Sequence, residues 1–321
     1  MRYRQLGRTG LEVSEIGFGA WGISGAQWLG AEDQESLRAL ETARSNGINF
    51  FDTALAYGEG HSEQLLARAF KSDAKAIIAT KVPPKNRVWP AQKGSALRDV
   101  FPKQYVLDCL DTSLRNLQRD QVDILQFHVW NDAWSSDPEW LDTMHTLRAA
   151  KRARFIGISI NDHQPANVIR ALETGLVDCV QVIYNIFDQS PEDELFPYCQ
   201  QNGIGVIVRV PFDEGSLTGK VRPDTRFPEG DFRNVYFAGD RKRQVWDRVQ
   251  KIAAVTKTDI DRLPELALRF VLGHPAVGTV IPGMRSTRHV TANARVSDPG
   301  PLDPETRNIL KQHRWVRSFY A

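Results

Sequence analysis

The sequence predicts an α/β fold, a (β/α)8 or TIM barrel with an N-terminal β-hairpin and long loops at the C-terminal barrel face. Short β-rich runs alternate with amphipathic helical segments, eight such runs occur, and nothing interrupts the alternation over 321 residues. One barrel takes roughly 250 residues and tolerates insertions, so we expect a single domain over residues 1–321. A doubly wound parallel sheet shares the alternation and stays open as an alternative.

The N-terminal segment precedes the first barrel strand. Residues Arg2–Val13 hold the turn Gly7-Arg8-Thr9-Gly10 between two short extended runs, a pattern typical of a β-hairpin. We expect this hairpin to plug the bottom of the barrel.

Eight runs rich in apolar and β-branched residues are the expected barrel strands. They are Ile16–Ala20, Ile48–Asp52, Ala76–Lys81, Asp123–His128, Phe155–Ser159, Cys179–Val182, Ile204–Val210 and Val277–Ile281. Three of the helical segments between them are expected to end at a glycine, Gly47, Gly175 and Gly203, because glycine readily adopts the left-handed conformation that closes a helix. The first helix places Leu37, Leu40 and Ala43 on one face and can pack against the barrel.

Two long polar stretches, Pro83–Pro102 and Asp213–Asp240, each follow a predicted strand. Connections of this length in a compact domain are usually binding loops or lids. Three tryptophans in loops after strands, Trp21, Trp89 and Trp130, are candidates for the wall of a substrate pocket. Ordinary packing explains these large aromatic side chains equally well.

Composition and charge exclude several classes of protein. Lys and Arg total 41 against 39 Asp and Glu, and a net charge of +2 gives no general field for binding nucleic acid or an anionic membrane. No run approaches the ~20 apolar residues of a transmembrane helix, and the N-terminus lacks an apolar signal core. The three cysteines are far apart and form no metal-binding motif, so we expect a reducing, cytoplasmic location.

Four polar residues lie at or just after the ends of predicted strands. Asp52 and Tyr57 belong to the second strand end, Lys81 to the third and His128 to the fourth. The C-terminal ends of barrel strands share one face, where such folds place their chemistry, so we expect the four side chains to converge. No Cys or Glu stands near His128 at ligand spacing, and we expect no metal.

This set suits the reduction of a carbonyl group, which needs a hydride on carbon and a proton on oxygen. A phenol with a pKa near ~10 is a poor acid unless it is tuned, and Lys81 beside Tyr57 would lower that pKa. Asp52 would hold Lys81 charged and oriented, while His128 would donate a hydrogen bond to the carbonyl oxygen. A barrel isomerase or aldolase with a Schiff base at Lys81 is an alternative.

An ordered series of motifs carries a resemblance to a known family. The motifs are Gly17-Phe18-Gly19-Ala20-Trp21, Asp52-Thr53-Ala54 with Tyr57-Gly58, Ser62-Glu63, Thr80-Lys81, Ser113-Leu114 with Leu117, Asp123 with Gln126 and His128, and Leu217-Thr218-Gly219-Lys220. Through them the sequence resembles the aldo-keto reductase superfamily over nearly its whole length. The resemblance implies a catalytic tetrad of Asp52, Tyr57, Lys81 and His128, with Tyr57 as general acid and base.

The resemblance also implies a nicotinamide cofactor across the barrel mouth, NADPH with NADH as the alternative. Its implied contacts toward the nicotinamide and the pyrophosphate are Gly19, Trp21, Ser159, Asn161, Gln181, Arg209, Pro211, Phe212, Leu217, Gly219 and Lys220. Those toward the adenosine are Gly283, Arg285, His289 and Asn293. Arg285 and the start of the helix that follows it suit a phosphate group.

Three positions depart from the pattern of the family. Ile160 follows Ser159 where the family has Asn, which leaves Asn161 as a candidate for the carboxamide contact. Arg209 stands where an aromatic residue normally stacks on nicotinamide, and its charge would repel the oxidised, cationic ring more than the neutral reduced ring. His289 stands where a phosphate-contacting Arg or Gln often occurs, so the preference for NADP over NAD stays open.

These observations predict an NAD(P)H-dependent oxidoreductase that interconverts an aldehyde, ketone or sugar hemiacetal with its alcohol or lactone. Its partner is expected to be a small carbonyl or sugar substrate, with no nucleic acid and no membrane. A cofactor-binding regulatory or redox-sensing subunit is the alternative. The substrate depends on the two long loops and on the tail through Tyr320, and its identity, the physiological direction and the oligomeric state stay open.

Overall fold

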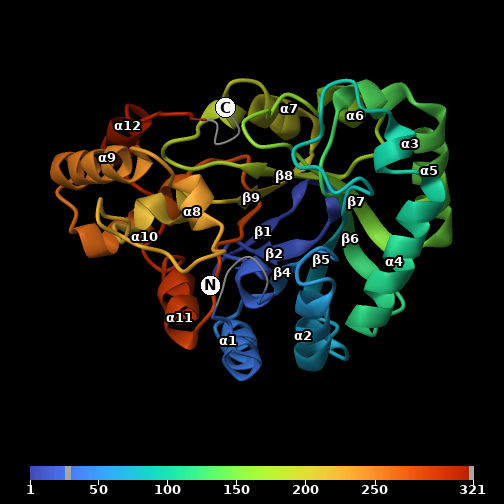
Figure 1. The fold of residues 1–321 in the computed structure, drawn as a ribbon, viewed down its shortest axis with the longest axis horizontal. Helices are drawn as coiled ribbons and strands as arrows, with labels where there is room; N and C mark the ends of the chain where they lie inside the picture. The colour runs from blue at the N-terminus through green and yellow to red at the C-terminus, as the bar shows by residue number, and fades with distance from the viewer. Residues whose placement is uncertain (26–29, 318–321) are drawn as a thin grey trace.

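A computed structural model describes residues 1–25 and 30–317, so Tyr320 lies outside the described residues. Eight parallel strands form one curled sheet with helices around it (Figure 1). The strands are β3 (Phe18–Gly19), β4 (Phe50–Asp52), β5 (Ile77–Val82), β6 (Val122–Phe127), β7 (Ala153–Ser159), β8 (Cys179–Ile183), β9 (Gly205–Arg209) and β10 (Thr279–Val280). Each overlaps a strand that the sequence predicts, and the predicted fold class is confirmed.

The two ends of the strand order meet and close the sheet into a barrel. Gly17 N donates to Val280 O at 2.8 Å, and Val280 N donates to Glu15 O at 3.0 Å. A Cβ atom at Gly19 would lie only 2.7 Å from Ile281 O, so glycine permits the close approach at this seam. An open sheet has no such seam, and the doubly wound alternative is therefore wrong.

The predicted N-terminal hairpin is present. Its strands are β1 (Tyr3–Gln5) and β2 (Glu12–Ser14), which pair antiparallel. Arg8 N donates to Gly203 O, two residues before β9 begins, at 2.6 Å, and the buried Leu6 belongs to the same apolar cluster as Ile207 inside the barrel. The hairpin therefore covers the end of the barrel where the strands begin.

Helices pack against the outside of the sheet (Figure 1). They are α1 (Asp33–Ser45), α2 (His61–Phe70), α3 (Leu97–Val100), α4 (Lys103–Leu117), α5 (Pro138–Ala150), α6 (Ile169–Glu173), α7 (Leu195–Asn202), α8 (Arg233–Tyr236), α9 (Arg241–Thr256), α10 (Leu263–Leu272), α11 (Thr287–Arg295) and α12 (Pro304–Lys311). Helix α1 buries Leu40 and Ala43 and partly buries Leu37, as its spacing predicts. Across residues 1–25 and 30–317, no helix has the length and apolar character to cross a membrane.

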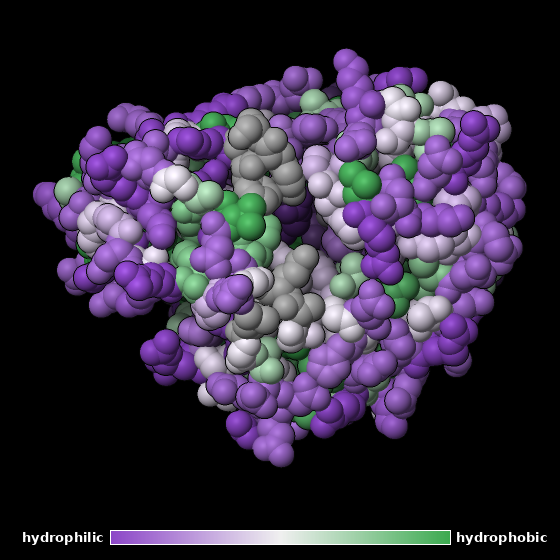
Figure 2. All heavy atoms as spheres, in the orientation of Figure 1, coloured by the Kyte–Doolittle hydropathy of each residue, from purple (hydrophilic) through white to green (hydrophobic). Residues whose placement is uncertain are grey.

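The two long loops contain short helices. Residues 83–102 hold α3, and residues 213–240 begin with the 3-10 turn Asp213–Thr218 and hold α8. Four-residue helices carry too little periodicity to be predicted from sequence. The surface in Figure 2 is mostly hydrophilic and has a hollow near the middle of the view.

Candidate active site

A buried ion pair forms the base of the candidate site. Lys81 Nζ donates to Asp52 Oδ1 at 2.5 Å and to Thr53 O at 2.7 Å. The Lys81 side chain is completely buried, and that of Asp52 is 3% exposed. The pairing of β4 with β5 sets this contact, because Asp52 lies opposite Ala79, two residues before Lys81. Close pairing is needed here, since an uncompensated buried charge costs several kcal/mol.

Two buried amides complete the surroundings of Asp52. Gln181 Nε2 donates to Asp52 Oδ2 at 2.7 Å, and Gln126 Nε2 donates to the same oxygen at 3.2 Å. Gln181 Nε2 also lies 3.3 Å from Gln126 Oε1. Gln126 is not among the predicted site residues, although an amide in the buried strand Val122–Phe127 signals a buried polar network, because buried polar groups need partners.

Tyr57 lies in the loop after β4, beside the ion pair. Lys81 Nζ is 5.0 Å from the centroid of the Tyr57 ring. Burial raises the pKa of the Tyr57 phenol, the charge of Lys81 lowers it, and the net pKa is raised above its usual value. The expected lowering is therefore wrong in net direction, because burial outweighs the effect of Lys81, which does have the predicted sign.

His128 follows β6 and faces Tyr57, with ring centroids 5.7 Å apart and ring planes at 72°. Burial and the charges of Lys81 and Arg209 hold the pKa of His128 well below its usual value, so the ring is neutral at pH 7. Its Nδ1 is buried and has no hydrogen-bond partner among the described residues. A neutral imidazole can donate one hydrogen bond, and a buried polar atom without a partner points to a bound ligand.

Motif residues around these four side chains brace the segments that carry them. Thr53 Oγ1 donates to Ser62 Oγ at 2.9 Å, and Ser62 Oγ donates to Ala20 O at 3.1 Å. The Glu63 carboxylate accepts from Thr80 Oγ1 at 2.6 Å, and burial raises the pKa of Glu63. Residues of the family motifs such as Ser62 and Glu63 therefore stabilise the loops around the site.

The three loop tryptophans have different surroundings. Trp21 lies beside Tyr57, at 6.2 Å between ring centroids. Trp89 is 38% exposed and meets His128 edge-on at 5.9 Å. Trp130 is completely buried against three other aromatic rings. The geometry favours a pocket wall for Trp21 and Trp89, and it favours packing rather than substrate contact for Trp130.

Of the two residues considered for the carboxamide contact, Asn161 is already hydrogen-bonded to the protein. Ser159 ends β7 and is buried. Asn161 Nδ2 donates to Trp130 O at 2.8 Å, and Asn161 Oδ1 accepts from the backbone N–H groups of Ala91 and Trp130 at 3.3 Å each. Asn161 therefore joins two loops, and a contact with nicotinamide would require it to exchange these bonds.

Arg209 is the last residue of β9, and its positive charge acts on Tyr57 and His128. Its Nη2 donates to Asp162 Oδ1 at 2.5 Å and to Ile160 O at 2.9 Å. Burial raises the pKa of Tyr57 and lowers that of His128, the charge of Lys81 lowers both, and the charge of Arg209 is a weaker influence that also lowers both. The arginine that replaces the aromatic residue of the family thus lies close enough to act on these two groups.

A buried polar cluster ties the loop of residues 213–240 together. Tyr236 Oη donates to Asp213 Oδ1 at 2.8 Å, and Arg241 Nη2 donates to Tyr236 Oη at 2.7 Å. Phe232 of the same loop meets Trp21 at 5.6 Å between ring centroids. The two ends of the loop are therefore held together, and Phe232, near its C-terminal end, contacts Trp21, a neighbour of Tyr57.

The other residues predicted to contact the cofactor from this loop also have structural surroundings. Pro211 is buried and Phe212 is partly buried against the core. Leu217 is buried in the core. Gly219 has φ +69°, and a Cβ atom there would lie 2.3 Å from a neighbouring isoleucine. Lys220 is exposed and pairs with a neighbouring aspartate at 2.7 Å.

Positive charge gathers where α11 begins. Ser286 caps this nine-residue helix, and its side chain accepts from His289 N. Burial and then the charge of Arg233 lower the pKa of Arg285. Burial and then Arg288 and Arg285 lower the pKa of His289, so its ring is neutral at pH 7.

This donor set fits a phosphate group. Guanidinium groups and the free N–H groups at a helix start both favour an anion. Gly283 is exposed, with open space where a Cβ would stand, and Asn293 is 6% exposed. At the adenosine end of the predicted cofactor site, the residues around the start of α11 are suited to a phosphate group. At the nicotinamide end, Asn161 is already hydrogen-bonded to the protein, so the residues are less suited to binding the carboxamide.

Comparison with known proteins identifies relatives along nearly the whole chain. The Aldo/keto reductase family matches residues 15–314. An aldo-keto reductase of Bacillus subtilis, YhdN, is 29% identical over 303 residues, covering 92% of this chain and 89% of that protein. An NADH-specific methylglyoxal reductase of Escherichia coli is 29% identical over 311 residues, covering 91% and 92%. The holo form of an aldo-keto reductase from Bacillus halodurans has a TM-score of 0.76 and 30% identity, covering 98% and 96%.

The fold and the comparisons define an oxidoreductase of the class that acts on carbonyl or alcohol groups with a nicotinamide cofactor. The chain belongs to the aldo/keto reductase family. The resemblance that its motifs carry is thereby confirmed.

Proposed function

We propose that this protein is an NADPH-dependent reductase of aldehydes, ketones or sugar hemiacetals in which Tyr57 is the general acid and base. One observation carries the proposal. Tyr57, the buried pair of Lys81 with Asp52, and a neutral His128 lie together at the C-terminal ends of neighbouring strands. Such a set can deliver a proton and stabilise a developing oxyanion.

The nicotinamide cofactor supplies the hydride when it is bound, and side chains of the protein supply the proton. Because its pKa is raised, the Tyr57 phenol keeps its proton at neutral pH and can give it to the substrate oxygen. Lys81 stabilises the phenolate that results, and Asp52 keeps Lys81 in place. His128 donates a hydrogen bond that orients the carbonyl oxygen.

Cofactor binding and turnover test this proposal. Fluorescence titration with NADPH and NADH gives the two affinities, and we expect NADPH to bind more tightly because Arg285 and Arg288 flank the start of α11. Turnover of small aldehydes with the bound cofactor is the expected result. Tight binding without turnover of any carbonyl would instead favour the regulatory or redox-sensing subunit.

The Schiff-base alternative has weaker support. Lys81 is fully buried and its ammonium donates to Asp52 and Thr53, whereas a nucleophilic lysine must lose its proton and reach the substrate. Borohydride trapping of a carbonyl substrate on Lys81 would overturn the reductase mechanism.

The pH dependence of the two directions should be opposite. Reduction needs the protonated phenol, and the raised pKa of Tyr57 should keep kcat/KM for reduction flat from pH 7 to about pH 10. Oxidation of an alcohol needs the phenolate, so its kcat/KM should rise by about tenfold per pH unit over this range. A one-proton fall of the reduction rate below pH 9 would contradict the raised pKa.

Arg209 should bias binding toward the reduced cofactor. Its positive charge disfavours cationic nicotinamide, so NADP⁺ should bind more weakly than NADPH, and Arg209→Tyr should shrink that ratio by roughly tenfold. Asp162→Asn is the matched variant, because it removes the carboxylate paired with Arg209 and should widen the ratio. Titration of both redox forms measures it, and equal affinities in the unmodified protein would refute the bias.

A further inference from the structure

The C-terminal segment, residues 312–317, crosses from the loop after β8 to helix α9. It is anchored on that loop where α12 ends, because Gln189, which is 4% exposed, donates from Nε2 to the last two carbonyl groups of α12 at 3.4 and 3.3 Å. Trp315 N then donates to Phe187 O at 2.8 Å, and the two rings meet edge-on at 5.5 Å between centroids. These contacts fix the position of Trp315 relative to the loop.

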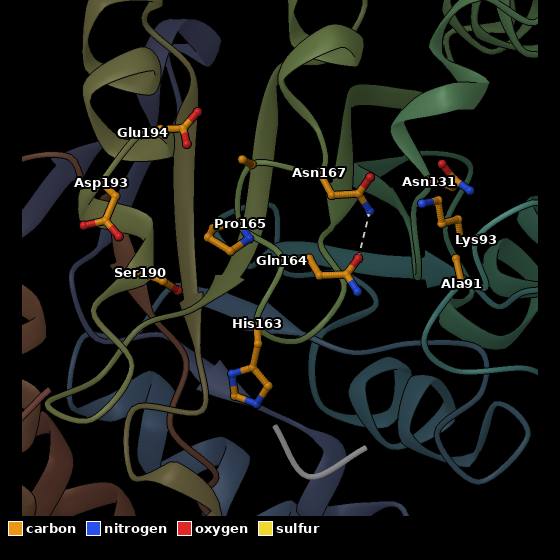
Figure 3. A pocket seen from close by; sticks show the side chains of 11 residues that line it. Ala91, Lys93, Asn131, His163, Gln164, Pro165, Asn167, Ser190, Asp193 and Glu194 are labelled. Atoms are coloured by element: carbon orange, nitrogen blue, oxygen red, sulfur yellow. Dashed lines mark hydrogen bonds between the residues drawn. The ribbon is translucent and has the colours of Figure 1, made fainter. Parts of the chain in front are cut away.

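A salt bridge adds an anchor beside the cavity between the loops that follow β5, β6, β7 and β8. Asp193 lines this polar cavity of about 590 Å³ (Figure 3), and it accepts from Arg314 Nη1 at 2.8 Å. Both side chains are about half exposed, so the pair contributes little to stability by itself. Its place shows that the C-terminal segment lies at the end of the barrel where the strands finish, as the candidate active site does.

Trp315 also contacts two arginines of α9. The guanidinium carbon of Arg248 is 4.0 Å from the centroid of the Trp315 ring, and that of Arg241 is 5.9 Å from it. The two arginines are seven residues apart and therefore lie on one face of the helix. A guanidinium within about 6 Å of a tryptophan ring is attracted to the negative face of the ring. Trp315 therefore attaches the C-terminal segment to α9.

Arg241 links Trp315 to the loop of residues 213–240. Its guanidinium carbon lies 4.1 Å from the centroid of the Tyr236 ring, so one guanidinium contacts both rings. Tyr236 Oη accepts from Arg241 Nη2 and donates to Asp213 Oδ1, which joins the end of the loop to its beginning. The Arg241 side chain is 7% exposed, and its Nε has no hydrogen-bond partner among the described residues. Contacts with the two rings therefore help to hold Arg241 in place.

We propose that Trp315 is a positioning residue that holds Arg241 against Tyr236 and so keeps the loop of residues 213–240 closed over a bound cofactor. The inference rests on the proposed reductase function and on the cofactor contacts that the sequence predicts for this loop. Without the Trp315 ring, Arg241 loses its contact with the C-terminal segment, and the two ends of the loop should separate more often. Release of the cofactor should then become faster.

The rate of NADPH release tests this inference. Stopped-flow mixing of the NADPH complex with excess NADP⁺ gives the rate constant from the loss of NADPH fluorescence. Trp315→Ala should raise it about tenfold, because a cation–π contact contributes roughly twofold when exposed and up to about thirtyfold when desolvated. Trp315→Phe keeps an aromatic ring and should stay within about threefold of the unmodified protein. Val316→Ala changes the exposed neighbouring side chain and is the control with an unchanged rate.

A double-mutant cycle tests the route through the loop. Tyr236→Phe keeps the ring but removes the hydroxyl that joins Arg241 to Asp213, and it should itself speed release. If Trp315 acts by way of this hydroxyl, Trp315→Ala added to Tyr236→Phe should raise the rate less than about twofold further. Effects of the two substitutions that simply multiply would overturn the proposed route.

Hydrogen exchange of the cofactor-free protein separates a local effect from a general loss of stability. Trp315→Ala should speed exchange in residues 213–236 about tenfold and leave α4 and α5, on the opposite side of the barrel (Figure 1), unchanged. An unchanged rate of NADPH release from Trp315→Ala would overturn this inference alone. Absence of NADPH binding by the unmodified protein would overturn the proposed function and, with it, this inference.

Discussion

Tyr57→Phe should lower kcat/KM for aldehyde reduction by about 10²–10⁴-fold, the usual contribution of a general acid. The substitution removes only the phenolic oxygen, and the ring that lies beside Trp21 at 6.2 Å is kept. NADPH affinity should therefore stay within about twofold of the original, because no cofactor contact is assigned to Tyr57. Steady-state kinetics and fluorescence titration measure the two quantities.

Tyr198→Phe is the control for this experiment. Tyr198 lies in α7, within residues 195–202, and is partly buried, so loss of its hydroxyl should not alter turnover. If Tyr57→Phe retained more than half of the original rate while Tyr198→Phe behaved normally, Tyr57 would not be the proton donor.

Lys81→Met should destabilise the fold by about 3–5 kcal/mol at pH 7. The substitution leaves the Asp52 carboxylate buried, with only the amides of Gln181 and Gln126 as donors. A buried carboxylate without its counter-ion keeps the desolvation penalty and loses the attraction that offsets it. Chemical denaturation monitored by tryptophan fluorescence gives the free energy of unfolding.

A double substitution separates charge imbalance from lost packing. Asp52→Leu combined with Lys81→Met removes both charges, and replacement of a buried pair by apolar residues is often close to neutral. We expect the double variant to regain most of the lost stability while turnover stays abolished. A single Lys81→Met variant as stable as the unmodified protein would show that Asp52 needs no counter-ion.

The fold follows from patterns that a sequence carries locally. Period-two apolar runs and glycine helix ends mark the strands and their connections. In the sequence, only the number of strands favours closure of the barrel, because the seam between Gly17 and Val280 is a long-range contact. The clustering of Asp52, Tyr57, Lys81 and His128 could be predicted because all strands of a parallel barrel end at the same face, which brings residues far apart in sequence together.

Features that depend on burial and on contacts between loops could not be predicted. The raised pKa of Tyr57 reflects how much of the phenol is removed from water, which no motif encodes. Asn161 binds backbone groups of Ala91 and Trp130, a contact set by the arrangement of two loops. Likewise, the sequence does not show that Trp130 is buried while Trp89 is exposed, because the conformation of each loop decides this.

The seam of the barrel has a consequence for synthesis on the ribosome. It joins Gly17 to Val280, so the sheet cannot close until β10 has been made. At roughly 5–20 residues per second, several seconds pass between the completion of β9 at Arg209 and that of β10 at Val280. During this interval both outer strands of the nascent sheet expose unpaired backbone groups. Chaperone capture should therefore be greatest for ribosome-bound chains that end between these two strands.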